Sequence, residues 1–125
     1  MRKAVHTETA PKPIGPYSQA VVEGNLIFVS GQGAINPATG QVERGDARSE
    51  TKRVFENLEA ILAAAGSSLA KVVKCNVYLR DINDFQAMNE VYATYFEAPY
   101  PARTTIQAGA LPAGIAVEIE VVARI

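Results

Sequence analysis

The stretch ARSETKRVFENLEAILAAAG, residues 47–66, decides how this chain folds. Its apolar residues recur at intervals of three and four, at Val54, Leu58, Ile61, Leu62 and Ala65. This spacing collects them on one side of an α-helix, and that side must be buried against another layer of structure. Gly66 stands where helices commonly end in a left-handed residue. The sequence therefore predicts one long amphipathic helix that ends at Gly66.

Strand-like segments lie on both sides of this helix. Residues 17–23 and 26–32 are separated by Gly24-Asn25 and have the pattern of a β-hairpin. Further strands are predicted over residues 71–79, 104–108 and 116–124. One face of the strand over residues 71–79 is expected to carry Val73, Cys75, Val77 and Leu79.

A second helix is predicted over residues 84–98, because Pro99 disfavours its continuation. Its apolar stripe consists of Phe85, Met88, Val91, Tyr92, Tyr95 and Phe96. Residues 1–16 contain three prolines and show neither helical nor strand periodicity. They are therefore expected to form an extended lead-in.

These elements predict a single domain over residues 1–125 with an α+β fold, in which two helices cover one face of a sheet. The segment LIFV, residues 26–29, is apolar on both faces of its strand. Two helices on one side leave the other side uncovered, and such an apolar surface is a liability in a monomer. We therefore expect an oligomer that buries the second face.

The charge and cysteine content narrow the class of protein. The 125 residues include 12 basic and 13 acidic side chains, which is not the excess of positive charge that binds phosphates, so nucleic acid is not an expected partner. Cys75 is the single cysteine, so no intrachain disulfide is expected, which fits a reducing compartment. Neither a secretory signal nor a membrane-spanning stretch is recognisable, and a cytoplasmic location is expected.

Short motifs for cofactors and metals are weak in this sequence. Gly31-Gln32-Gly33 lacks the third glycine of the dinucleotide fingerprint, because Asn36 occupies its place. His6 is the single histidine, so neither a metal cluster nor a Ser-His-Asp triad is expected. The residues themselves thus predict neither a cofactor nor a metal.

Arg103 is the side chain with the most informative setting, since it precedes a strand-like run of small and apolar residues. It has two interpretations: an exposed charge at a strand edge, or a fork that binds a carboxylate through two parallel hydrogen bonds. Glu118 and Glu120 share one face of the last strand, a pattern typical of a solvated face. Periodicity alone therefore leaves the function open.

Three segments are informative in combination: IGPYSQAV (residues 14–21), FVSGQ (residues 28–32) and PARTTIQAGALP…VEIE (residues 101–120). Together with DINDFQAMNEVY (residues 81–92), they resemble the Rid family, the reactive intermediate deaminases also called YjgF proteins. The resemblance covers essentially the whole chain. It is closest to the RidA subgroup.

The resemblance implies a chorismate-mutase-like (ferredoxin-like) α+β fold, assembled as a homotrimer with sites in clefts between subunits. It also implies hydrolysis of 2-imino acids, such as 2-iminobutanoate and 2-iminopropanoate, to 2-keto acids and ammonia, which protects pyridoxal-phosphate enzymes. No cofactor is expected. One alternative is a non-catalytic protein that senses 2-keto or 2-imino acids. Another is a ribonuclease or translation inhibitor, against which the balanced charge argues.

Residue roles follow from the positions that match the family motif. The resemblance implies that Arg103 binds the substrate carboxylate, helped by the Gly31 backbone amide and the Thr105 side chain. Glu118 is expected to orient or deprotonate the water that attacks the imine carbon. A positioned carboxylate of this kind typically contributes about 10²–10⁴-fold to a rate.

The remaining matched positions are Tyr17, Ser30 and Asn89. Tyr17 and Ser30 are expected to line the cleft, with Tyr17 reaching across the subunit boundary. Many RidA proteins carry cysteine where this chain has Thr105, which keeps a hydrogen-bonding side chain but no thiol. Cys75 is not a substitute, because it is expected to be buried in its strand.

Overall fold

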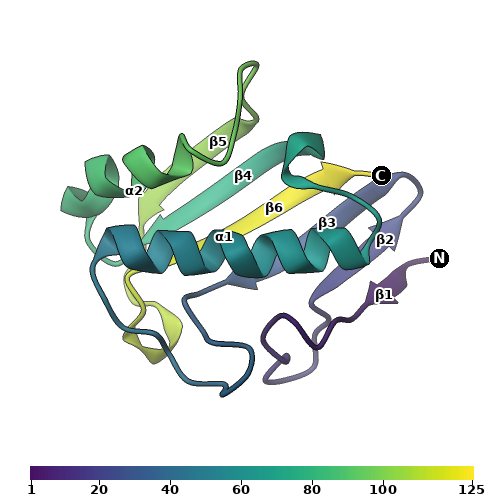
Figure 1. Cartoon of the computed structure of the whole chain (residues 1–125), viewed down its shortest axis with the longest axis horizontal. Coiled ribbons are helices and arrows are strands. Elements are labelled where there is room, and N and C mark those ends of the chain that lie inside the picture. The colour runs from purple at the N-terminus through teal and green to yellow at the C-terminus, as the bar shows by residue number, and fades with distance from the viewer.

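The computed structural model describes residues 1–125 and contains one six-stranded sheet with both α-helices on the same face (Figure 1). The strands are β1 (Lys3–Val5), β2 (Ala20–Glu23), β3 (Leu26–Gln32), β4 (Val72–Leu79), β5 (Ala102–Gln107) and β6 (Val117–Arg124). Their order in the sheet is β1-β2-β3-β6-β4-β5, and all neighbours are antiparallel except β4 and β5. The predicted α+β fold class, two helices on one face of a sheet, is confirmed.

Helix α1 (Ala47–Ala64) has a defined start and a defined end. At the start, the Asp46 side chain accepts a hydrogen bond of 2.9 Å from the backbone N–H of Ser49, an N-cap that satisfies one free donor. At the end, Gly66 adopts a left-handed φ of 80°, and the next residue, Ser67, donates its N–H to the carbonyl of Leu62. This is a Schellman ending, as the sequence predicted.

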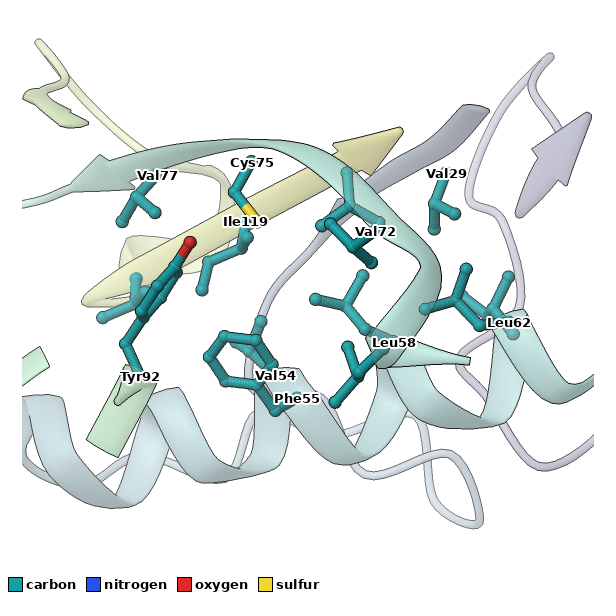
Figure 2. Close-up of a cluster of buried hydrophobic side chains, with 14 of the residues drawn as sticks. Val29, Val54, Phe55, Leu58, Leu62, Val72, Cys75, Val77, Tyr92 and Ile119 are labelled. Carbon is teal, nitrogen blue, oxygen red and sulfur yellow. The ribbon is translucent and has the colours of Figure 1, made fainter. Parts of the chain in front are cut away.

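The core lies between α1 and the helix-facing side of the sheet (Figure 2). Val54, Phe55 and Leu58 of α1 are fully buried and point toward the strands. Their partners from the sheet include Val29, Val72, Cys75, Val77 and Ile119. Each large apolar side chain buried in this way stabilises the fold by about 1.5–3 kcal/mol.

No helix of the chain has the length and apolar character needed to cross a bilayer.

Helix α2 (Phe85–Tyr92) is shorter than predicted, because the regular helix stops well before Ala98. Thr94 and Tyr95 donate their N–H groups to carbonyls three residues back, which tightens the chain into turns. Tyr95 nevertheless stacks on Phe55 with ring centroids 4.5 Å apart. The aromatic residues after α2 thus bury their rings without helical backbone, which the apolar periodicity alone could not distinguish from a longer helix.

Strand β4 differs from the prediction at its start. The register with β6 shifts between Val72 and Lys74, so Val72 is 7% exposed whereas Val73 is 44% exposed. Simple alternation predicted that Val73 shares the buried face with Cys75, and this prediction is wrong. A bulge adds one residue to one strand and reverses the side-chain alternation before it.

The lead-in contains a strand that the sequence analysis did not predict. Lys3–Val5 forms β1 and pairs with Ala20–Val22 of β2. Gln19 reinforces this attachment from a fully buried position, because its side chain accepts the N–H of Thr7 and donates to the carbonyls of Thr7, Ala10 and Pro11. An edge strand held by backbone pairing needs little apolar alternation of its own, so its pattern was not recognisable.

The sheet face opposite the helices is uncovered in one chain, and we call it the open face. Ile27 and Val29 of β3 enter the core, while Phe28 between them is 44% exposed on the open face. Ile106 of β5 is also exposed there. The expected apolar surface on the second face is thus confirmed, and what covers it stays a prediction.

We expect the protein to form a trimer whose subunits bury the open face. Light scattering in dilute solution should give about three times the chain mass of 13.4 kDa. Phe28→Lys should shift the protein toward monomer, because it places a charge on this apolar surface. Ala63→Lys, on the exposed side of α1, is the matched control and should leave the mass unchanged. A stable wild-type monomer would refute this prediction.

Candidate active site

Arg103 lies on edge strand β5 directly beneath α2. Its register partner on β4 is Cys75, which is fully buried, so the Arg103 side chain leaves the sheet on the helix-covered face. Its Cζ lies 4.7 Å from the ring centroid of Tyr92 and 5.5 Å from that of Phe85. Its Nη1 donates a hydrogen bond of 2.6 Å to Oδ1 of Asn89.

These three contacts come from one side of one helix. Phe85, Asn89 and Tyr92 stand at positions i, i+4 and i+7 of α2, which share a helix face. A cation over an aromatic ring gains about 0.5–2 kcal/mol, depending on how far it is desolvated. Helix α2 therefore orients the guanidinium without neutralising its charge. We call Arg103, Phe85, Asn89 and Tyr92 the arginine group.

The guanidinium keeps free donors for a ligand. None of the ion pairs within the chain includes Arg103. Asn89 binds Nη1, which leaves the edge formed by Nε and Nη2, and this edge matches a carboxylate with two parallel hydrogen bonds. A depression of about 450 Å³ opens beside it, lined by Asn89, Tyr92, Ala93, Tyr100, Pro101 and Arg103. The arginine group can therefore bind a small carboxylate.

The Thr105 hydroxyl, two residues along β5 on the same face as Arg103, is buried without a hydrogen-bond partner. The Tyr92 hydroxyl points toward the strands, where the Cys75 thiol is a weak partner beside it (Figure 2). A buried hydroxyl without a partner costs about 1–3 kcal/mol. Such a cost is typical of a site whose partner is a ligand or a water molecule.

Cys75 and Tyr92, the two titratable groups beneath the guanidinium, both have a raised pKa. Burial raises the pKa of the Cys75 thiol, and burial likewise raises the pKa of the Tyr92 hydroxyl. Both groups therefore stay protonated and uncharged at neutral pH. The expectation that Cys75 is buried is confirmed, and its environment favours neither a thiolate nucleophile nor a metal ligand. No three His, Cys, Asp or Glu side chains converge as a metal site.

Glu118 belongs to a second group, on the open face. It faces Tyr78 across the β4–β6 ladder, and neighbouring Val117 and Ile119 point into the core. Its carboxylate is half-buried and forms no hydrogen bond or ion pair within the chain. Burial first, and then the nearby charge of Glu120, raise the pKa of Glu118. A carboxyl group in this state is suited to accept and return a proton.

Gly31 and Ser30 lie beside Glu118. A register shift between Val29 and Gln32 places two residues of β3 where the ladder has room for one. A Cβ atom on Gly31 would lie 2.4 Å from Oε2 of Glu118, so only glycine leaves this carboxylate in place. Ser30 donates its hydroxyl to the carbonyl of Ser18 at 2.7 Å. We call Glu118, Gly31 and Ser30 the glutamate group.

Two buried polar residues of α1 hold the backbone around the glutamate group. Asn57 donates to the carbonyls of Gly33 and Ile35, directly after β3. Glu50 accepts the N–H of Ala116 at 2.9 Å, directly before β6. Both side chains are about 1–2% exposed, so these hydrogen bonds are shielded from water. They position the chain that carries Gly31 and the chain that leads to Glu118.

Tyr17 lies in the segment that precedes β2 and is 51% exposed. Its hydroxyl accepts the N–H of Ile14 at 3.2 Å, and its own N–H binds the carbonyl of Gly15. It makes no hydrogen bond to Arg103 or Glu118 within one chain. Its neighbour Ser18 binds Ser30, which attaches this segment to the glutamate group.

The arginine group and the glutamate group lie on opposite faces of the sheet. Arg103 and Thr105 project beneath α2, whereas Glu118 projects from the open face, with β4 between their strands. The resemblance implied that the Gly31 amide assists Arg103, but one chain does not bring these two residues together. A ligand with a few carbon atoms cannot contact both faces of a sheet. A site that uses both groups therefore requires a second copy of the chain.

The contribution of α2 to the site was not predicted from the sequence. Phe85 and Tyr92 were assigned only to an apolar stripe, although they hold the guanidinium with Asn89. Their spacing with Asn89 was available as a signal. What the spacing could not reveal is that α2 crosses over β5, so that this face meets Arg103 rather than more apolar side chains.

Comparison with known protein families identifies the class of protein to which this chain belongs. The family described as Endoribonuclease L-PSP matches residues 7–125. This chain belongs to that family, the Rid or YjgF family.

Individual relatives are similar over nearly the whole length. A RutC family protein of Pyrococcus horikoshii is 51% identical, with 98% of each chain covered. The 2-iminobutanoate/2-iminopropanoate deaminase of Bos taurus is 47% identical, over 98% of this chain and 90% of the relative. The crystal structure of RidA from the Antarctic bacterium Psychrobacter has a TM-score of 0.94 and 45% identity, with 98% of this chain and 99% of that one covered.

The unpartnered hydroxyl of Thr105 leads to a specific expectation for ligand binding. Thr105→Val, which keeps the shape and removes the hydroxyl, should weaken the binding of 2-ketobutyrate by about 1.5–3 kcal/mol, the range for hydrogen bonds to charged groups. Thr105→Ser should bind nearly as well as the wild type. Calorimetric titration measures both.

The melting temperature provides the control for this substitution. Because the Thr105 hydroxyl has no partner within the chain, Thr105→Val should not lower it. Wild-type affinity in Thr105→Val would show that the hydroxyl does not contact the ligand.

Proposed function

We propose that this protein hydrolyses small 2-imino acids, such as 2-iminobutanoate and 2-iminopropanoate, to 2-keto acids and ammonia. The observation that carries the proposal is an arginine held by α2 with its carboxylate-binding edge free, beside an open depression. Relatives named as 2-iminobutanoate/2-iminopropanoate deaminase, at 42–47% identity, support the substrate class. Removing such imines protects pyridoxal-phosphate enzymes from them. The unpaired Cys75 fits a reducing location such as the cytoplasm.

The proposed site lies between subunits. One subunit supplies the arginine group and Thr105, and a neighbour supplies the glutamate group and Tyr17. This contact joins two different surfaces of the same chain, and such contacts close into a ring when the rotation between subunits allows it. A homotrimer gives each of three clefts one copy of each group. The opposite placement of Arg103 and Glu118 in one chain supports this arrangement.

The reaction needs little machinery, because an imine carbon is already electrophilic. Arg103 holds the carboxylate, which places the imine carbon opposite Glu118. The substrate reacts as its iminium form, in which the nitrogen is already protonated. As the water oxygen bonds to the iminium carbon, Glu118 accepts one water proton and the C=N π electrons move to nitrogen, which gives a neutral carbinolamine. Glu118 then gives this proton to the amine nitrogen and takes up the hydroxyl proton as the carbonyl forms and the C–N bond breaks. Ammonia leaves with that last proton, as ammonium. Fixing substrate and water supplies much of the acceleration.

Two families of substitutions test binding separately from chemistry. Arg103→Ala and Arg103→Lys should both abolish deamination and 2-ketobutyrate binding, because lysine supplies charge without the planar fork. Glu118→Gln should still bind 2-ketobutyrate, while imine turnover falls by about 10²-fold or more. The assay couples an amino-acid oxidase to the protein and follows the loss of imine. Glu59→Gln, an exposed residue on α1, removes the same charge and serves as the control.

Each alternative function makes a different forecast for these variants. A protein that only senses 2-keto or 2-imino acids would bind them through Arg103 and would not accelerate imine loss even as the wild type. A ribonuclease would cleave RNA regardless of Arg103. Full deaminase activity in Arg103→Ala would refute the proposal, and wild-type turnover in Glu118→Gln would refute the role of Glu118.

The activity should depend on pH through Glu118. Its pKa is raised by burial and by Glu120, so the carboxylate becomes protonated at a higher pH than an ordinary glutamate. A protonated Glu118 cannot accept a proton from water, and kcat/KM should therefore fall as the pH is lowered through this raised pKa. Glu118→Gln should lack this acid limb. A wild-type profile that is flat on the acid side would contradict the assignment.

A further inference from the structure

Glu120 lies two residues after Glu118 on β6 and projects from the same open face. Its Oε1 accepts a hydrogen bond of 2.5 Å from the Tyr78 hydroxyl and one of 3.2 Å from Nδ2 of Asn76. Glu118 has no such donor within the chain. The two neighbouring carboxylates therefore have the same residue type and different surroundings.

The direction of the Tyr78 side chain makes this difference informative. In the β4–β6 ladder, Tyr78 stands directly opposite Glu118, and Asn76 stands opposite Glu120. The Tyr78 hydroxyl nevertheless reaches diagonally to Glu120 rather than to the carboxylate it faces. Diagonal neighbours on one sheet face are within reach of a long aromatic side chain. Both neighbouring donors thus bind Glu120, and Glu118 accepts no hydrogen bond within the chain.

We propose that Glu120, held by Tyr78 and Asn76, is a positioning residue that controls when Glu118 carries a proton. Two hydrogen bonds, from Tyr78 and Asn76, hold the Glu120 carboxylate beside Glu118. The negative charge of Glu120 disfavours a second charge on Glu118. Glu118 consequently keeps a proton more readily than an isolated glutamate, which is the condition for a group that accepts and returns one.

The pKa directions at the two ends of this network agree with the geometry. The hydrogen bond to Glu120 is the largest cause that raises the pKa of Tyr78, so Tyr78 remains the donor. Glu120 is the second cause, after burial, that raises the pKa of Glu118. The role of Glu120 in catalysis rests on the proposed deaminase function, whereas the coupling between the two carboxylates does not.

Few other charges face this pair. On β4, Lys74 lies in a depression of about 150 Å³ together with Asn76 and Glu120, and its Nζ donates to Thr104 of β5. Arg80, just after β4, donates to the carbonyl of Gly114. Strand β3 contributes no charged side chain beside them, and both helices lie on the other face.

In the proposed cleft, Arg103 of a neighbouring subunit would also face Glu118. It would favour the ionised form of this carboxylate, opposite to the effect of Glu120. Lys74 and Arg103 are unchanged in a Glu120 variant. A comparison with the wild type therefore isolates the contribution of Glu120.

The test is a carboxyl ¹³C NMR titration of Glu118 in the full-length protein. In Glu120→Gln, the Glu118 midpoint should move to lower pH, because the neighbouring charge is gone. In Tyr78→Phe, which removes one donor from Glu120, the Glu118 midpoint should also move to lower pH, because the Glu120 charge is held less firmly beside it. Glu59→Gln, on the opposite side of the molecule, should leave the Glu118 midpoint unchanged. The acid limb of kcat/KM should shift in the same direction as each midpoint.

An unchanged Glu118 midpoint in a folded Glu120→Gln protein would overturn the proposal. If Glu120→Gln does not fold, Tyr78→Phe decides, and unchanged midpoints there would overturn it equally. Midpoints that shift together with the acid limb support the positioning role. If the Glu118 midpoint shifts in the variants but the wild-type protein has no deaminase activity, the proposed function is refuted and the coupling of Glu118 to Glu120 is established.

Discussion

Helices cover only one face of the sheet in this protein, and side chains along each strand alternate between the two faces. Everything on the covered face must fit beneath α1 and α2, which accounts for the dense packing of Phe55, Leu58 and Ile119. Everything on the open face meets solvent or another subunit. Chemistry that combines the two faces must therefore come from two chains, because no side chain reaches through a sheet that is closed by backbone hydrogen bonds.

The covered face also keeps an arginine charged without an acidic partner. Buried arginines are usually paired, since desolvating an isolated charge is costly. Arg103 avoids most of that cost by lying on an edge strand, with an amide and an aromatic ring as neighbours. An acidic neighbour would have neutralised the guanidinium and occupied its fork. The choice of Asn89 rather than a carboxylate at that point leaves the arginine available to an anionic ligand.

The open face carries Glu118, and its surroundings there favour the exchange of a proton. Tyr78 and Asn76 are bound to Glu120, and Gly31 leaves space that any larger residue would take from Glu118. The single histidine, His6, follows β1, and the Cys75 thiol is buried on the covered face. Burial and a neighbouring charge act on an ordinary glutamate instead, through the same two physical effects that tune carboxyl groups in many enzymes.

The sequence alone determined the long helix and its ending at Gly66, the α+β class and the apolar second face, because local periodicity encodes them. Its resemblance to the Rid family marked Arg103 and Glu118 as candidates. It did not reveal β1, the end of α2 at Tyr92 or the reversed alternation at Val72. Those features depend on backbone pairing, aromatic contacts and a bulge between distant segments. Only the tertiary structure placed Arg103 beneath α2 and Glu118 on the opposite face, because the order and register of strands are set by packing across the whole sheet.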